Sequence, residues 1–216
     1  MATMAGSPGT QPLSGAGPAT THAAPPASMA GMVADPAPLG LAAFGITTLM
    51  LSAVNSGWIG DAATTAVLSM AVPFGGAAQV LAGMWAFRRG NTFATTAFTS
   101  FGAFWISYYL LLNFFIAPVA HASAGEASQI VGLYLFSWGL FTAYMFVASL
   151  GGARAVQSVF ALLALTFFAL CIGEWGASTT WHHIGGYLGI ATACAAIYTS
   201  FADVTNANFG RRILPT

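Results

Sequence analysis

Hydroxyl groups recur at helical spacing in the segment 88–105, which reads RRGNTFATTAFTSFGAFW. Groups that donate and accept hydrogen bonds, placed along one face of an apolar helix, could line a pathway for a small polar solute. Alternatively, such hydroxyls bond to carbonyls of their own helix or join neighbouring helices. Four of these residues share one stripe of the predicted helix and a serine follows them: Thr92, Thr95, Thr96, Thr99 and Ser100.

A second group of chemically active side chains consists of Glu174, His182 and His183. They lie within one short stretch of the sequence that also contains Trp175 and Trp181. Because histidine changes charge near neutral pH, these residues are candidates for a proton site at the outer mouth of a pathway. Alternatively, they anchor helix ends at a membrane surface, where tryptophan is enriched.

Away from this group, the sequence shows no paired carboxylates inside the apolar segments, and its two cysteines have no metal-ligand spacing. An enzyme embedded in a membrane would need convergent ionisable or metal-binding groups there. We therefore expect no enzyme activity, no metal and no cofactor. The formal net charge is zero and lysine is absent, so nucleic-acid binding is not indicated either.

The elements that must position these groups are transmembrane helices. The chain is 57% hydrophobic and 5% charged, which is too apolar for a soluble domain. Apolar runs of about 20 residues, the length that spans a bilayer, recur along it. The predicted fold is an all-α membrane protein with six transmembrane helices, at about residues 39–56, 64–87, 92–117, 128–150, 154–173 and 181–202.

The first two predicted spans each contain one amide side chain. Asn55 is near the end of the first span, and Gln79 follows Pro73 and two glycines in the second. Proline and glycine free backbone groups that must be satisfied within the protein, so we expect a kink there. Both amides are predicted to face inward, since lipid disfavours polar groups. Gln79 could instead serve only as a hydrogen bond between helices.

The arginines predict the topology. Arg88 and Arg89 follow the second span, Arg154 follows the fourth, and Arg211 and Arg212 follow the sixth. With six spans all five lie on one side, so the positive-inside rule places both termini in the cytoplasm of a cell-membrane protein. Residues 1–34, rich in Ala, Pro and Gly, are predicted to be a disordered cytoplasmic tail. Residues 35–216 are predicted to form the membrane domain.

Several motifs after residue 34 occur together in one order: DPAPLGL (35–41), GGAAQVLAG (75–83), RRGNTFATTAFTSFGAFW (88–105), GLYLFSWGLFTAYMF (132–146), GGARAVQSVF (151–160) and NFGRRILP (208–215). In these motifs the chain resembles the acetate uptake transporters, the succinate–acetate permease family. The resemblance implies six helices per protomer and a homohexamer with one pathway in each protomer. It also implies transport of acetate and other short monocarboxylates, and in some members succinate.

The resemblance further implies an apolar constriction formed by Phe44, Phe101 and Leu163. Phe101 stands where members of the family often have tyrosine, so here the constriction lacks a hydroxyl. Ala196 aligns with a small residue that influences the size of the solute. With these assignments the predicted lining of the pathway is Thr47, Asn55, Gln79, Thr96, Thr99, Ser100 and Ala196.

A bare carboxylate loses several kcal/mol of hydration in an apolar constriction. We therefore expect passage to favour the protonated acid or to be coupled to protons, so that flux rises as the external pH falls. Two alternatives remain open at this stage. One is a channel for a small neutral solute such as urea, a short amide or ammonia, and the other is a sensor or structural protein of the membrane.

Overall fold

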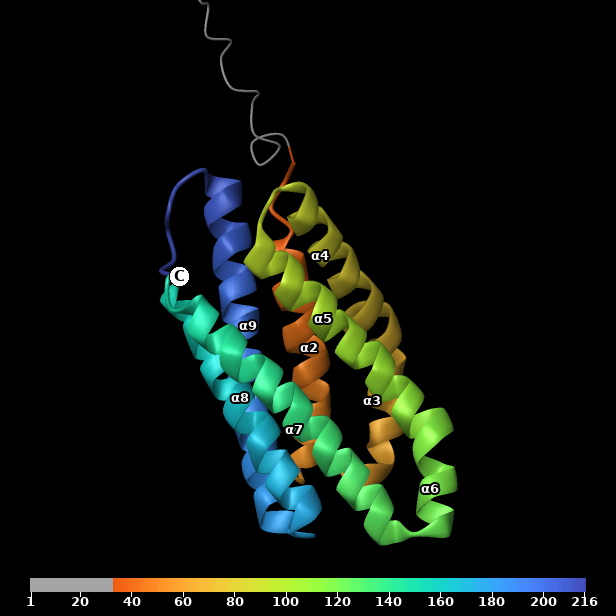
Figure 1. Ribbon diagram of the computed structural model, residues 1–216. Helices are drawn as coiled ribbons and strands as arrows, with labels where there is room; N and C mark the ends of the chain where they lie inside the picture. The colour runs from red at the N-terminus through yellow and green to blue at the C-terminus, as the bar shows by residue number, and fades with distance from the viewer. Residues whose placement is uncertain (1–32) are drawn as a thin grey trace, which may run out of the picture.

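The computed structural model describes residues 33–216, which fold as helices joined by short turns (Figure 1). The predicted disordered tail, residues 1–34, lies outside the described residues apart from its last two. The prediction of six apolar spans is confirmed. The helical stretches long and apolar enough to cross a membrane are Ala37–Asn55, Asp61–Arg88, Thr92–Ala122, Ala124–Ser149, Arg154–Trp175 and Thr179–Phe209.

Four of the spans are single helices and two are interrupted. The first span is α2 (Ala37–Asn55), and the last three are α7 (Ala124–Ser149), α8 (Arg154–Trp175) and α9 (Thr179–Phe209). The second consists of η1 (Asp61–Ala63), α3 (Thr64–Met70), η2 (Ala71–Ala78) and α4 (Gln79–Arg88). The third consists of α5 (Thr92–Leu110), η3 (Leu111–Phe115) and α6 (Ile116–Ala122).

The interruptions are π-helical stretches, and each contains or precedes a proline. Pro73 lies within η2, at the place where the sequence predicts a kink. The sequence predicts an end of the third span at about residue 117, just before Pro118, but the helix continues to Ala122. Pro118 is the third residue of α6, within a first turn that follows η3, and a first turn tolerates a residue without an N–H donor.

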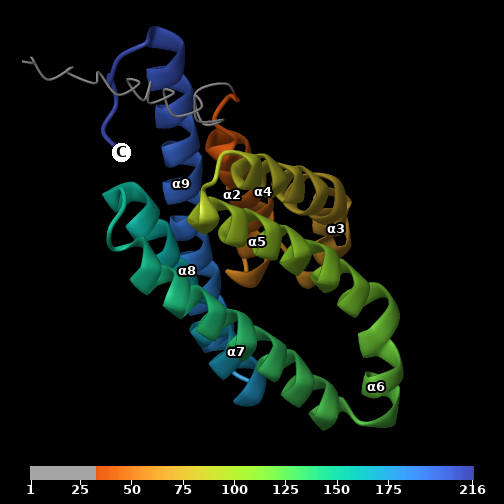
Figure 2. The ribbon, with the colours of Figure 1, turned by 45° about the horizontal axis from the view of Figure 1, so that its top comes forward.

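The first span lies between α9 and the second span, an arrangement that Figures 1 and 2 both show. Glycines bring α9 close to α2. A Cβ atom added at Gly186 would lie 2.2 Å from the backbone nitrogen of Ser56, and one at Gly189 would lie 2.2 Å from Oγ of Ser52. Small residues on α9 therefore permit the close helix approach that the sequence indicates.

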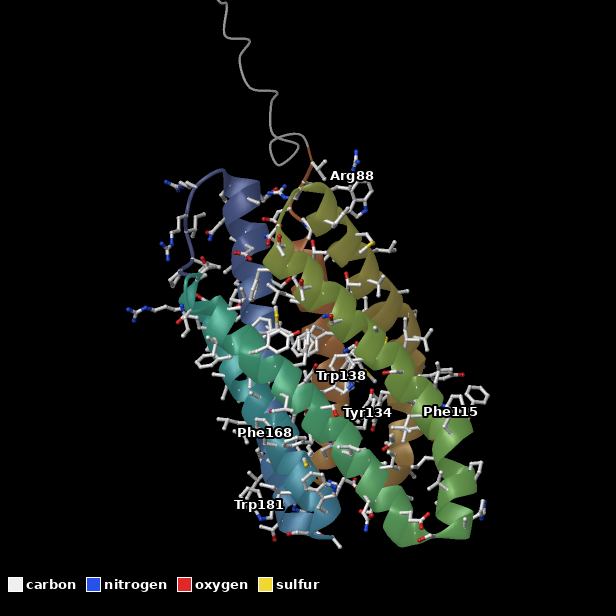
Figure 3. The ribbon with its side chains drawn as sticks, in the orientation of Figure 1. Arg88, Phe115, Tyr134, Trp138, Phe168 and Trp181 are labelled. Atoms are coloured by element: carbon white, nitrogen blue, oxygen red, sulfur yellow. The ribbon has the colours of Figure 1, made fainter. Side chains whose placement is uncertain are left out.

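The described chain begins and ends at the same end of the bundle (Figure 1). Figure 3 places Arg88 at this end and Trp181 at the opposite end. Asp35 accepts a hydrogen bond from the backbone N–H of Ala37 at 3.0 Å, which ties down the start of α2, and lies 3.8 Å from Nη2 of Arg89. The end that carries Arg88 is thus held by a contact between the first span and the turn after the second.

Candidate functional site

Two cavities lie one above the other inside the bundle. The cavity nearer Arg88, here called the arginine-end cavity, has a volume of 150 Å³, and the far-end cavity has a volume of 90 Å³. Phe44 of α2 and Leu163 of α8 line both cavities. The two spaces therefore meet at these side chains.

The residues predicted to form a constriction come together at this meeting point. Phe44, Phe101 and Leu163 are 5%, 3% and 4% exposed, so each points into the protein rather than toward lipid. The ring centroids of Phe44 and Phe101 are 5.6 Å apart, and Phe101 lines the arginine-end cavity. We call these three residues the waist. All three side chains are hydrocarbon, so the waist offers a solute no hydrogen bond.

Other aromatic rings hold Phe101 in place. Its centroid lies 5.3 Å from that of Phe141, 6.0 Å from Phe160 and 6.1 Å from Trp138. Figure 3 shows Trp138 midway along the bundle. Tilted and edge-to-face contacts at these distances are the favoured arrangements of aromatic pairs, so the waist is backed by a second layer of rings on α7 and α8.

The arginine-end cavity is mostly apolar and has three polar lining residues: Gln79, Asn91 and Asp203. Gln79 opens α4 directly after η2 and is 1% exposed, and its Oε1 atom has no hydrogen-bond partner. Asn91 accepts a hydrogen bond from the backbone N–H of Ala94 at 2.9 Å and so caps α5. An unpaired amide group beside a cavity is free to bond a solute or a water.

The far-end cavity is richer in polar groups. Its hydroxyl, amide and titratable lining residues are Thr48, Ser52, Asn55, Tyr108, Tyr134, Thr166, Glu174 and His182. The imidazole Nε2 of His182 lies 3.6 Å from Oε1 of Glu174. In the part of the chain that the structure describes, no arginine lines either cavity, and the sequence contains no lysine. Nor do three His, Cys, Asp or Glu side chains of residues 33–216 gather as metal ligands.

Seven of the predicted site residues line these cavities: Phe44, Asn55, Gln79, Phe101, Leu163, Glu174 and His182. The hydroxyl ladder of α5 does not. Thr96 lines a separate groove at the turn between α4 and α5, together with Thr92 and Thr95. The Oγ1 atom of Thr99 is buried and would lie 2.2 Å from a Cβ atom added at Gly83, which places it between α4 and α5. Ser100, the next residue, is half-buried and lines neither cavity.

Three further predicted residues also lie elsewhere. Thr47 donates its hydroxyl to the carbonyl of Ala43 at 2.9 Å, as isolated threonines in helices do. Ala196 is fully buried and packs against Gly45 between α9 and α2. His183 is exposed and its ring lies over Gly57, so it does not join the pair formed by Glu174 and His182.

Sequence reasoning missed much of the lining of the far-end cavity. Thr48, Phe167 and Tyr108 line it, and they follow the waist residues of α2, α8 and α5 by four, four and seven positions. Residues at these spacings share a helix face. Helical periodicity, applied from each waist residue toward the C-terminal end of its helix, would therefore have identified these residues.

Comparisons with known proteins show the family of the chain. A model of the GPR1/FUN34/yaaH family matches residues 17–213. The succinate-acetate/proton symporter SatP of Escherichia coli (strain K12) is 39% identical over 183 residues, which are 85% of this chain and 95% of the relative. Acetate permease A of Emericella nidulans is 34% identical over 194 residues, which are 84% of this chain and 65% of the relative.

A solved structure is also similar. The structure of the bacterial acetate channel SatP aligns with a TM-score of 0.75 at 38% sequence identity, and the alignment covers 85% of this chain and 98% of that one. At 38% identity the two proteins share much of the sequence of their helices as well as the arrangement of the helices.

Proposed function

The chain belongs to the GPR1/FUN34/yaaH family, and from this membership we propose that it moves acetate and other short monocarboxylates across a membrane, with protons. Its relatives are named a succinate-acetate/proton symporter, an acetate permease and an acetate channel. The protein is thus a transporter or channel and not an enzyme. The observation that carries the proposal is the pair of cavities that meet at the waist.

The waist sets the form in which the solute crosses. Removing a carboxylate from water without a partner costs several kcal/mol even after the protein relaxes. The hydrocarbon side chains of Phe44, Phe101 and Leu163 cannot replace that hydration. A neutral carboxylic acid has no net charge to strip of water, so it passes the same point at much lower cost. We therefore propose that the solute crosses the waist as the protonated acid.

The cavities on either side provide what the waist lacks. The far-end cavity offers hydroxyl and amide groups of Thr48, Asn55 and Tyr108, and the arginine-end cavity offers those of Gln79 and Asn91. A pathway with several weak polar sites and no deep trap permits fast throughput. Hydrated solute is thus accommodated before and after the waist.

The test is uptake of radiolabelled acetate into proteoliposomes between pH 5 and pH 7.5. We expect uptake to rise as the external pH falls, because the fraction of neutral acid rises. Flat uptake, or uptake that increases toward neutral pH, would refute crossing as the neutral acid. Succinate and lactate added as competitors define the range of carboxylates.

A neutral solute is the second candidate, because the waist carries no group that selects for an acid. Urea, a short amide and ammonium are therefore included as competitors in the same assay. If urea, the amide or ammonia entered while acetate did not, the protein would be a channel for neutral solutes.

We also propose an orientation and an assembly. The end with the arginines faces the cytoplasm, since positively charged loops remain on that side, and the far-end cavity then opens outward. Six protomers form the hexamer that the resemblance implies, each with its own pathway. A fluorescent protein fused to the C-terminus should fluoresce only with a cytoplasmic terminus, and native mass spectrometry should give the mass of six chains.

A further inference from the structure

An acid and a base meet in the wall of the far-end cavity. Glu174 belongs to the last turn of α8 and His182 to the first turn of α9. Their nearest side-chain atoms, Oε1 and Nε2, are 3.6 Å apart, and the side chains are 26% and 33% exposed. The pair is therefore reached from water on one side and lines the path to the waist on the other.

Both side chains are held by neighbours. The hydroxyl of Ser128 on α7 donates to the backbone carbonyl of Glu174 at 2.6 Å and lies 3.3 Å from Oε2 of its carboxylate. A Cβ atom added at Gly173 would lie 2.7 Å from Cδ2 of His182, so the glycine leaves room for the imidazole ring against α8. Three helices thus fix the pair at the entrance, which a merely solvated acid and base at a helix end would not require.

We propose that the Glu174–His182 pair is the proton donor of the pathway, and that it converts an incoming carboxylate into the neutral acid in the far-end cavity. This inference rests on the proposed function. It adds the identity of the residues that supply the proton, and it places the step on the outer side of the waist.

The proton transfer is balanced as follows. An N–H bond of protonated His182 breaks, an O–H bond forms on the carboxylate of the solute, and imidazolium and carboxylate both become neutral. The imidazole then takes a proton from external water. Glu174 takes no part in the transfer: its Oε1 lies 3.6 Å from Nε2 and orients the imidazole ring. The step removes two opposite charges from a small cavity, where charges are costly to keep.

Other titratable groups face the pair from each adjacent element. Tyr108 of α5 and Tyr134 of α7 line the same cavity, and Cys171 lies one turn before Glu174 on α8. Phenols and thiols in water hold their protons at neutral pH, so these groups carry no charge that competes with the pair. Asp203 lines the other cavity, on the far side of the waist.

The experiment compares His182→Gln with His183→Gln in the full chain in proteoliposomes. Between pH 5.0 and 6.5 the neutral fraction of a free carboxylic acid falls about 25-fold. Uptake by His182→Gln should fall with that fraction, about 25-fold, whereas wild type and His183→Gln, which keep the proton donor, should fall less over the same interval. Glutamine retains hydrogen bonding, so a purely structural role would lower uptake without steepening this profile.

The outcomes are distinct. No acetate uptake by the wild type would end the proposed function, and the inference with it. Wild-type uptake with the same pH profile in His182→Gln would overturn the inference alone. If His182→Gln failed to fold, Glu174→Gln would decide by the same profile. A steeper profile in that variant supports the pair, and an unchanged profile contradicts it.

Discussion

Replacing Leu163 by phenylalanine should obstruct the waist without unfolding the protein. Leu163 is 4% exposed, lines both cavities and packs where Phe44 does. A phenyl ring in place of the isobutyl group adds bulk where the two cavities meet. Two residues further along α8, Leu165 is 54% exposed and faces outward, so Leu165→Phe makes the same chemical change away from the path.

The magnitude follows from the packing. Overfilling a packed interior costs about 1–3 kcal/mol, because neighbouring side chains must move. A solute that passes between the side chains of an overfilled waist must displace them, so it meets this cost at each passage. If it adds fully to the barrier, uptake slows by about 5- to 150-fold. The cost cannot be avoided by displacing Phe101, since four aromatic rings surround its own.

The assay is initial acetate uptake at pH 5, with equal amounts of each variant reconstituted. Elution as a single species and a cooperative melting transition establish that the variants are folded. Leu165→Phe should retain the wild-type rate. A folded Leu163→Phe protein with an unchanged rate would show that the solute does not pass between these side chains.

Three further substitutions test the packing around the site. Gly186→Ala should destabilise the protein by about 1–3 kcal/mol, because its Cβ atom would lie 2.2 Å from the backbone at the end of α2. The measurement is the melting curve in detergent. The control Gly125→Ala should leave the curve unchanged, because no atom lies nearer than 4.0 Å to its Cβ position. Asn91→Ala removes the hydrogen bond to the N–H of Ala94 and should cost about 1 kcal/mol, measured in the same way; an unchanged melting temperature would contradict the cap. Asn206→Ala removes three hydrogen bonds to residues 213–214 and should make the C-terminus faster to digest with carboxypeptidase, whereas equal rates would mean that other contacts hold it.

The number of spans could be predicted from the sequence because hydropathy along the chain measures a property that the bilayer selects. The residues of the waist could be placed only through the resemblance in motifs. Periodicity alone gives α5 two stripes of equal regularity, one of threonines and one that includes Phe98 and Phe101. In a soluble protein the polar stripe would face outward and the apolar stripe inward.

In a membrane protein the polarity of a stripe does not show which way it faces, since lipid and the protein interior are both apolar. A polar residue in a span can face a pathway or be satisfied within its own helix, and Thr95 is an example of the second case. Its hydroxyl donates to the carbonyl of Asn91 at 2.8 Å, so the helix itself satisfies the group wherever it points. Gln79 and Asn55 cannot fold back onto their helix as readily, and both line a cavity.

The two adjacent histidines illustrate a second limit. Neighbouring positions on a helix point about 100° apart, so at most one of them could meet Glu174. The sequence offers no criterion for choosing between them. Gly173 provides it in the structure, because the missing side chain leaves a space that the ring of His182 fills.

The π-helical stretch η2 has a consequence for the orientation of the half-span that follows it. A π turn holds more residues than an α turn, so α4 is rotated about its axis relative to a continuous α-helix through Ala71–Ala78. Deleting one residue within η2 would shift the phase of everything beyond it by about 100°. Gln79 would then turn away from the arginine-end cavity, although every apolar residue needed to cross the bilayer would remain.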